Sequence, residues 1–286
     1  MTSRTALLTA ITMLAFAANS LLCRAALGPE RIDPASFTTV RILAGAAALA
    51  VLARVIRRDP SVARSPGTWR SGLALFGYAA AFSLAYVSLD TGIGALILFG
   101  AVQLSMIGWA VASGERLRAL QWGGVIVALA GLLYLLLPGA TAPPPLGALL
   151  MCISGASWGW YSIRGREATD PLGMTAGNFA RAAPMTLGLS AGAIGALGWF
   201  ADPVGVALAA VSGAITSGLG YALWYLALRG LTTTAAAVVQ LTVPLIAAFA
   251  GVLVLDETVT TRLLLASVPI LGGVALVVTQ RAHSPR

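Results

Sequence analysis

Long apolar runs alternate along the chain with short segments that contain proline and charged residues. An apolar run of about 20 residues is long enough to cross a bilayer as a helix. Proline and charge disfavour the continuation of such a helix, as at Asp170-Pro171 and Asp202-Pro203. The pattern predicts ten transmembrane helices, near residues 4–26, 36–56, 70–89, 91–113, 119–137, 145–164, 173–200, 203–228, 231–255 and 260–281.

The composition indicates that a bilayer is the natural solvent of this chain. Of its 286 residues, 58% are hydrophobic and only 10% are charged, and the mean hydropathy is +0.87. A soluble domain is about 25% charged. Ten spans leave only short loops, which excludes a secreted enzyme, a nucleic-acid-binding protein and a disordered protein. We therefore expect an all-α integral membrane protein.

The arginines predict the orientation of the chain. All 18 basic residues are arginine, and the net charge is +8. Positive charge marks the cytoplasmic loops of membrane proteins. With the N-terminus inside, 13 arginines fall in cytoplasmic segments and three, Arg24, Arg31 and Arg262, in the opposite ones. This predicts a multi-pass protein of a bacterial inner (plasma) membrane with both termini cytoplasmic, and leaves Arg41 and Arg181 inside predicted spans.

The sequence resembles itself when it is shifted by 142 residues, because Glu115 then meets Glu257 and Gly131 meets Gly273. We predict two five-helix repeats, residues 1–141 and 142–286. Since five is odd, the second repeat enters the membrane in the inverted orientation. Inverted repeats are typical of transporters that work by alternating access. A duplication kept in a structural protein is the alternative.

Each repeat carries a small-residue-rich helix, then an acidic residue, then a helix with glycine. In the second repeat these are residues 235–245 (AAAVVQLTVPL), 256–258 (DET) and 272–273 (GG); in the first they are 94–96 (GAL), 114–115 (GE) and Gly131. On these motifs the whole chain resembles the drug/metabolite transporter superfamily in its ten-helix, two-repeat exporter form, except that Val102 takes the place of Pro244. Its aromatic-rich helices resemble most the bacterial aromatic amino-acid exporters. The resemblance implies export of amino acids, other metabolites or drugs.

Aromatic residues form one-sided stripes on three predicted helices. Their spacing of three or four residues places each stripe on one helix face. Tyrosine and tryptophan within a span are unusual because both prefer the membrane interface. We therefore predict a central chamber that accepts flat apolar groups, with ordinary helix packing as the alternative for any one residue. The candidate lining residues are Tyr78, Phe82, Tyr86, Trp158, Tyr161, Tyr221 and Trp224.

Polar residues inside the spans supply candidates for binding the head group of a substrate. Arg41 and Arg181 fit either a carboxylate anchor or a structural role, in which the side chain reaches the nearest interface or bonds a carbonyl at the C-terminus of a helix. Gly100 and Pro244 are the candidate bending points of two gating helices, since Pro244 removes a backbone hydrogen bond. The candidate amides, which can equally join helix to helix, are Asn19, Gln103 and Gln240.

The spans lack the residue clusters that catalysis or metal binding requires. No Asp or Glu lies near the middle of a predicted span, and the one histidine, His283, is in the tail. Cys23 and Cys152 lie in apolar runs and are interpreted as packing residues. No P-loop pattern is visible. We expect no enzyme activity, no metal and no cofactor, and transport that is secondary or facilitative.

Together these features predict an inner-membrane transporter that exports small metabolites by alternating access, in the first place aromatic or large neutral amino acids. Its partners are then the small-molecule substrate and the lipid bilayer, without nucleic acid. A monomer suffices because one chain holds both repeats. Two alternatives stay open: an anionic metabolite carrier that uses Arg41 and Arg181, and a non-transporting membrane scaffold.

Overall fold

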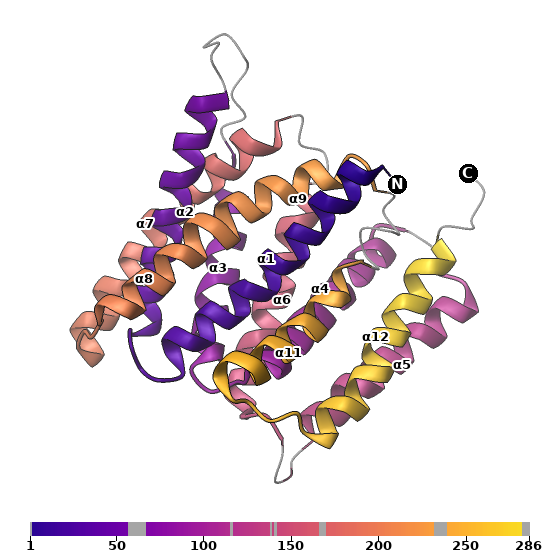
Figure 1. Cartoon of the computed structure of the whole chain (residues 1–286). Helices are drawn as coiled ribbons and strands as arrows, with labels where there is room; N and C mark the ends of the chain where they lie inside the picture. Colours follow the sequence, from indigo (N-terminus) through magenta and orange to yellow (C-terminus); the bar gives the residue numbers. More distant parts are fainter. Residues whose placement is uncertain are drawn as a thin grey trace.

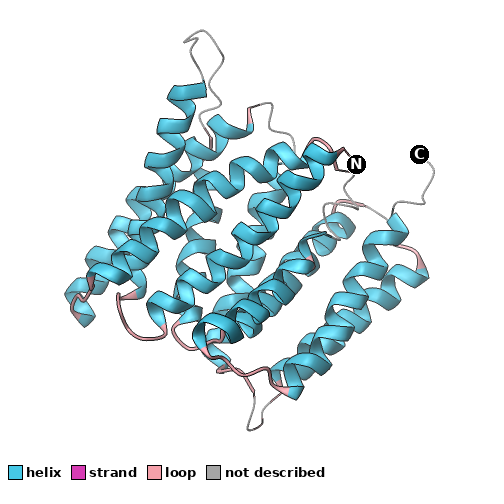
Figure 2. Cartoon of the chain, in the orientation of Figure 1, coloured by secondary structure: helices cyan, strands magenta, loops and turns pink. Residues whose placement is uncertain are grey.

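The computed structural model describes residues 2–56, 67–114, 117–137, 139, 142–165, 170–231 and 239–281. These residues form one all-helical bundle (Figure 1), and the described ranges contain no strand (Figure 2). A single antiparallel bridge joins Ile32 and Ala201. The helices are α1 (Ser3–Leu27), α2 (Pro34–Ile56), α3 (Trp69–Tyr86), α4 (Thr91–Ala112), α5 (Ala119–Leu136), α6 (Pro145–Gly165), α7 (Pro171–Leu197), α8 (Pro203–Val211), the π-helix η1 (Ser212–Leu219), α9 (Gly220–Leu228), α11 (Thr242–Leu255) and α12 (Thr261–Arg281).

Six described segments are long and apolar enough to cross a membrane by length and composition. Large apolar side chains on the outside of the bundle are exposed, for example Leu133 at 64% and Val268 at 75%. Such a surface suits contact with lipid rather than with water. The six segments are Ser3–Leu27, Pro34–Val55, Thr91–Ala112, Ala119–Leu136, Pro145–Gly165 and Pro203–Leu228.

An all-helical architecture with apolar spans agrees with the expected fold class. The count of ten transmembrane helices and the two repeats, 1–141 and 142–286, stay predictions. Several residues behind the sequence interpretation lie outside the described part of the chain: Arg57, Arg58, Arg64, Glu115, Arg116, Arg166, residues 232–238, His283 and Arg286.

Three helices, α2, α7 and α8, begin at a proline that follows an aspartate. Each aspartate accepts a hydrogen bond from the backbone N–H three residues later, at 2.8, 3.0 and 2.6 Å respectively. Such a cap satisfies an N–H group that has no partner inside the helix, and proline is tolerated at the first position because its missing N–H is not needed there. The Asp-Pro pairs that interrupt the apolar runs therefore set the starts of these helices.

Glycines bring α5 and α12 into close contact. A Cβ atom added to Gly124 would lie 2.7 Å from the carbonyl oxygen of Gly273, and one added to Gly131 would lie 3.1 Å from the backbone nitrogen of Ile270. The contacting residue numbers rise along one helix as they fall along the other, so the two helices are antiparallel. Small residues let two helix backbones approach in this way.

Some expected helix limits need correction. The third helix ends at Tyr86 rather than 89, and the seventh covers 171–197 rather than 173–200. The ninth run, expected as one helix over 231–255, is interrupted by a turn at Leu241 before α11 begins. Pro244 therefore lies in the first turn of α11, where its missing N–H costs no hydrogen bond, and not inside a continuous helix. α4 runs without a break through Gly100.

Candidate functional site

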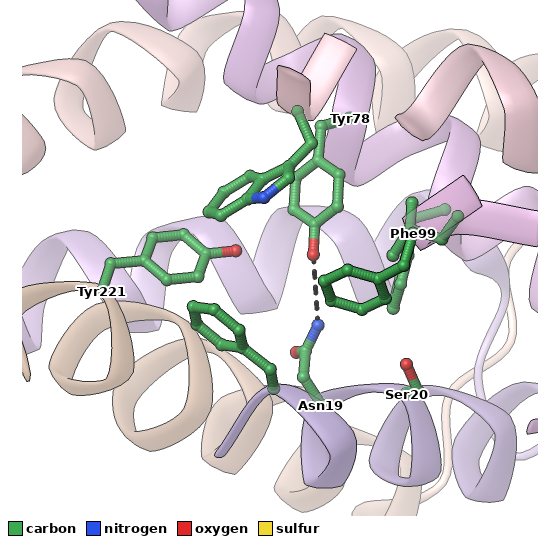
Figure 3. A pocket seen from close by; sticks show the side chains of 9 residues that line it. Asn19, Ser20, Tyr78, Phe99 and Tyr221 are labelled. Atoms are coloured by element: carbon green, nitrogen blue, oxygen red, sulfur yellow. Dashed lines mark hydrogen bonds between the residues drawn. The ribbon is translucent and has the colours of Figure 1, made fainter. Parts of the chain in front are cut away.

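A small cavity lies where α1, α3, α4, α6 and α9 meet (Figure 3). Its volume is about 20 Å³, which is room for about one water molecule. Five residues predicted from the sequence line it: Asn19, Tyr78, Phe82, Trp158 and Tyr221. Four further residues complete the wall: Phe16, Ser20, Leu98 and Phe99.

Trp158 stands at the centre of a cluster of aromatic rings. Its ring centroid is 4.7 Å from that of Tyr221, 4.9 Å from that of Tyr78 and 6.1 Å from that of Phe16. The rings meet edge-on or tilted, which is the favoured geometry of aromatic pairs. The aromatic residues of α3, α6 and α9 therefore do converge, and they form an apolar wall.

The polar end of the cavity is built around Asn19. Its Nδ2 donates a hydrogen bond to the hydroxyl of Tyr78 at 3.3 Å, drawn as a dashed line in Figure 3. Its Oδ1 accepts hydrogen bonds from Ser212, Thr216 and Ser217 at 2.8, 3.1 and 3.4 Å. All three hydroxyls come from η1, so the π-helix supplies a polar face to an otherwise apolar centre.

Arg41 lies beside this polar end and is buried. Its Nε donates to Ser217 at 3.0 Å, and its Nη2 donates to the hydroxyls of Tyr78 and Tyr221 at 3.0 and 3.5 Å. The residue is only 1% exposed. The interpretation that its side chain reaches the membrane interface is therefore wrong, because the guanidinium is held by hydroxyl groups in the middle of the bundle.

The remaining predicted aromatic residues lie around the cavity without lining it. Tyr161 stacks on Trp158 at 5.5 Å and accepts a hydrogen bond from Asn178. Tyr86 packs on Phe82 at 4.7 Å and donates to the carbonyl of Thr91. Trp224 packs on Phe16 at 5.9 Å. These residues pack against the side chains that line the cavity.

Three predicted polar residues lie elsewhere. Gln103 and Gln240 are buried but do not belong to the cavity wall. Arg181 donates to the carbonyl of Gly177 at 3.0 Å, and its guanidinium lies over the ring of Trp69 at 5.9 Å, at the start of α3. Arg181 and Arg41 thus have different surroundings, and the structure does not bring the two arginines together in one site.

Sequence reasoning missed the hydroxyl groups of η1. Two of these residues, Thr216 and Ser217, follow Ser212 by four and five positions. In an α-helix these three side chains would point partly to different faces. The wider turn of a π-helix, which is frequent at functional sites, aligns them. Gly213 lies beside them, where a Cβ atom would collide with the backbone of Arg41, and this close approach is visible only in the folded chain.

At the end of the bundle where α1 finishes, here called the Arg24 end, residues far apart in the sequence are joined by an ion pair and hydrogen bonds. Glu257 accepts hydrogen bonds from the N–H and hydroxyl of Thr91 at 2.9 Å, and its Oε1 lies 3.6 Å from Nε of Arg24. Burial raises the pKa of Glu257 above its usual range, while the hydrogen bonds from Thr91 oppose that shift. The contact joins α1 and α4 to the loop between α11 and α12.

A second set of contacts between distant residues lies at the same end. Arg31 pairs with Asp202 at 3.3 Å, and the bridge between Ile32 and Ala201 links the α1–α2 loop to the α7–α8 loop. The backbone N–H of Asp202 donates to the carbonyl of Arg31 at 2.7 Å. Both sets of contacts connect residues below 141 with residues above 142.

The opposite end, here called the Arg229 end, holds a wider pocket of about 420 Å³. Apolar side chains of α2, α7 and α9 line most of it, and Asp170 and Arg229 are its charged residues. Tyr225 lines this pocket one helical turn after Tyr221 of the central cavity. The Arg24 end therefore carries these two sets of contacts, while the Arg229 end, where the N–H of Thr68 donates to Asn178 and Arg164 donates to Ser71, contains the wider pocket.

Comparison with known proteins identifies relatives across the whole chain. Residues 145–279 match the EamA-like transporter family. An uncharacterized protein of Pseudomonas aeruginosa, PA1977, is 52% identical over 278 residues, which are 97% of this chain and 96% of the relative. An uncharacterized transporter of Archaeoglobus fulgidus is 27% identical and covers 90% of this chain and 91% of its own.

Two further similarities agree with these. The uncharacterized inner membrane transporter YedA of Escherichia coli K12 is 33% identical over 90 residues, which are 32% of this chain and 29% of YedA. A crystal structure with 21% sequence identity has the same fold, with a TM-score of 0.69 over 100% of both chains. The expected superfamily is confirmed, and it points to a non-enzymatic role. The chain belongs to the EamA-like transporter family of the drug/metabolite transporter superfamily and is a multi-pass membrane transporter.

Proposed function

We propose that this protein exports amino acids with aromatic or large neutral side chains from the cytoplasm by alternating access. The observation that carries the proposal is the central cavity, whose aromatic wall ends at the amide of Asn19. The rings around Trp158 would hold the side chain of the substrate. Asn19 would meet its head group, since an amide both donates and accepts hydrogen bonds.

The sizes of the two cavities support a proposed order of events in transport. About 20 Å³ is too small for an amino acid, so the aromatic rings must separate before a substrate enters. The pocket of about 420 Å³ at the Arg229 end lies within the usual range of small-molecule sites. With the predicted orientation, this pocket faces the cytoplasm and is where a substrate for export first enters.

Alternating access is supported by how the two predicted halves meet. The fifth helices of the repeats, α5 and α12, are antiparallel, as helices related by a two-fold axis in the membrane plane must be. The contacts of Glu257 and Arg31 at the Arg24 end join the halves and have to break before that end opens. The turn at Leu241, three residues before Pro244, offers a bending point for this motion. Gly100, within an unbroken α4, keeps its predicted gating role as a proposal.

Gln103 and Gln240 would join Asn19 at the head group only in another conformation, because neither lines the cavity in this one. The anionic carrier that needs both arginines loses support, since Arg181 contacts Gly177 and Trp69. A non-transporting scaffold would not require a ring of aromatic residues around a polar centre.

An uptake screen in proteoliposomes tests the proposal. Purified protein is reconstituted, and the entry of labelled amino acids is measured with and without a pH gradient. We expect saturable uptake of tryptophan and phenylalanine above that of empty vesicles. Uptake no faster than in empty vesicles for every amino acid would reject amino-acid transport, and a similar result for other metabolites would favour the scaffold.

A further inference from the structure

We infer that the guanidinium of Arg41 binds the carboxylate of the transported molecule. The inference rests on the proposed function and deepens it: the substrate of the central site is a carboxylic acid with a flat or large apolar group, and a compound without the carboxylate is a poor substrate. Arg41 is then the residue that determines this specificity.

The first argument is an uncompensated buried charge. Arginine keeps its charge at any pH that a protein tolerates, and Arg41 is only 1% exposed. The ion pairs of the described residues belong to Arg24 and Arg31, and none involves Arg41. A buried charge is costly within a membrane unless it faces a partner or a wet cavity, and for that reason it marks a substrate or ion path.

The second argument is an unused donor. Nε and Nη2 of Arg41 are occupied by Ser217, Tyr78 and Tyr221, whereas the buried Nη1 has no hydrogen-bond partner in the described structure. Buried polar atoms without a partner are rare, and each needs an explanation. A carboxylate provides it, since carboxylates pair with the guanidinium fork through short, charge-assisted hydrogen bonds.

The third argument is position. The Cζ atom of Arg41 lies 5.1 Å from the ring centre of Tyr78 and 4.9 Å from that of Phe82, and both rings line the central cavity. The hydroxyl of Tyr78 accepts hydrogen bonds from both Asn19 and Arg41. The guanidinium therefore stands directly behind the polar end of the cavity, and separation of the rings on opening brings it to the substrate.

The fold holds Arg41 in this place. A Cβ atom at Gly213 would collide with the backbone of Arg41, and one at Gly45 would collide with the ring of Phe179. Two glycines thus allow α2 to approach η1 and α7 closely around this residue. The other arginine within a predicted span, Arg181, differs in that its Nη1 donates to the carbonyl of Gly177 in its own helix.

Three ligands of the same shape test the inference on the unmodified protein. Phenylalanine carries an amine and a carboxylate, 3-phenylpropionate only the carboxylate, and phenethylamine only the amine. Each is added as a competitor to the uptake of labelled phenylalanine by proteoliposomes. We expect phenylpropionate to compete, and phenethylamine to compete roughly 10- to 100-fold more weakly than phenylalanine, as the loss of a charged hydrogen-bond partner requires.

The variant Arg41→Gln tests the residue itself. We expect it to lose the preference for carboxylates, so that phenylalanine and phenethylamine compete about equally, a change of specificity that mere loosening of the fold would not produce. Arg262→Gln is the matched control, since Arg262 donates to the carbonyl of Leu137 in an exposed position and should keep the preference. Size-exclusion chromatography establishes that both variants fold. If Arg41→Gln does not fold, the competition by the three ligands on the unmodified protein decides alone.

The outcomes separate the two proposals. Equal competition by phenethylamine and phenylalanine on the unmodified protein would overturn the role of Arg41 and leave amino-acid transport standing. An intact preference for carboxylates in a folded Arg41→Gln variant would also overturn it. Absence of uptake of phenylalanine and of every other amino acid tested on the unmodified protein would reject the proposed function, and the inference with it.

Discussion

Alanine in place of Gly124 should push α5 and α12 apart, whereas alanine in place of Gly123 should not. A Cβ atom at Gly124 would lie 2.7 Å from the carbonyl oxygen of Gly273 and 2.8 Å from a methyl group of Val277. The carbonyl belongs to the backbone of the partner helix and cannot rotate away. A Cβ atom at Gly123 would meet no heavy atom within 4 Å.

The difference between the two variants isolates the cost of this collision. Both gain the same helix propensity, about 1 kcal/mol for alanine over glycine, so this gain cancels between them. Overpacking a tight contact costs about 1–3 kcal/mol. Gly124→Ala should therefore be less stable than Gly123→Ala by about 1–3 kcal/mol. The partner helix offers the same comparison, because a Cβ at Gly273 would lie 2.5 Å from the carbonyl of Gly124, while one at Gly272 would meet nothing within 4 Å.

Thermal unfolding of the purified variants in one detergent, followed by tryptophan fluorescence, measures the effect. About 2–4 °C is expected for each kcal/mol in a chain of this size class. The Tm of Gly124→Ala should lie clearly below that of Gly123→Ala, with the same order for Gly273→Ala and Gly272→Ala. Equal Tm values within both pairs would show that α5 and α12 do not meet through these glycines.

Three further predictions concern the site and the Arg24 end. Because burial raises the pKa of Glu257, the folded state binds its proton more tightly than the unfolded state. Its contribution to stability is then full below the usual carboxylate pKa and is lost as the pH rises through the raised value. The Tm of the unmodified protein relative to Glu257→Gln should therefore fall as the pH rises above the usual carboxylate pKa of about 4, and a constant difference would contradict this. Tyr78→Phe, which removes the hydroxyl shared by Asn19 and Arg41, should lower the unfolding free energy by about 1–3 kcal/mol, whereas Tyr134→Phe, at an exposed position, should leave it unchanged; equal effects in thermal unfolding would refute the shared hydrogen bond. Trp158→Phe should reduce phenylalanine uptake more than Trp160→Phe, which changes the same helix away from the cavity, and the reverse order would remove Trp158 from the binding wall.

Much of the helical framework was accessible from the sequence, since it depends on local rules. Asp-Pro pairs between apolar runs determine where helices start, because the capping hydrogen bond joins residues only three positions apart. The period of the aromatic residues on α3, as in Tyr78 and Phe82, fixes a common face. The convergence of that face on Trp158 and Tyr221 was predicted from the joint pattern and is seen in the cavity wall.

Features that depend on contacts between helices were not accessible in this way. The depth of Arg41 in its helix was known from the sequence, but its hydroxyl partners come from α3, η1 and α9, which are remote in the chain. The hydroxyls of Ser212 and Ser217 face Asn19 together because the helix widens to a π-turn there, and no periodicity signals that change. Gln103 and Gln240 were equally good candidates by composition, yet tertiary packing places both away from the cavity wall.

Counterflow of phenylalanine tests the central claim most directly. Proteoliposomes loaded with unlabelled phenylalanine are diluted into a trace of labelled phenylalanine, and the label inside is followed with time. A carrier whose site opens to each side in turn exchanges the two pools, so we expect a transient accumulation of label above its equilibrium level that empty vesicles lack. Entry of label at the rate of empty vesicles, with or without internal phenylalanine, would contradict an alternating-access amino-acid carrier.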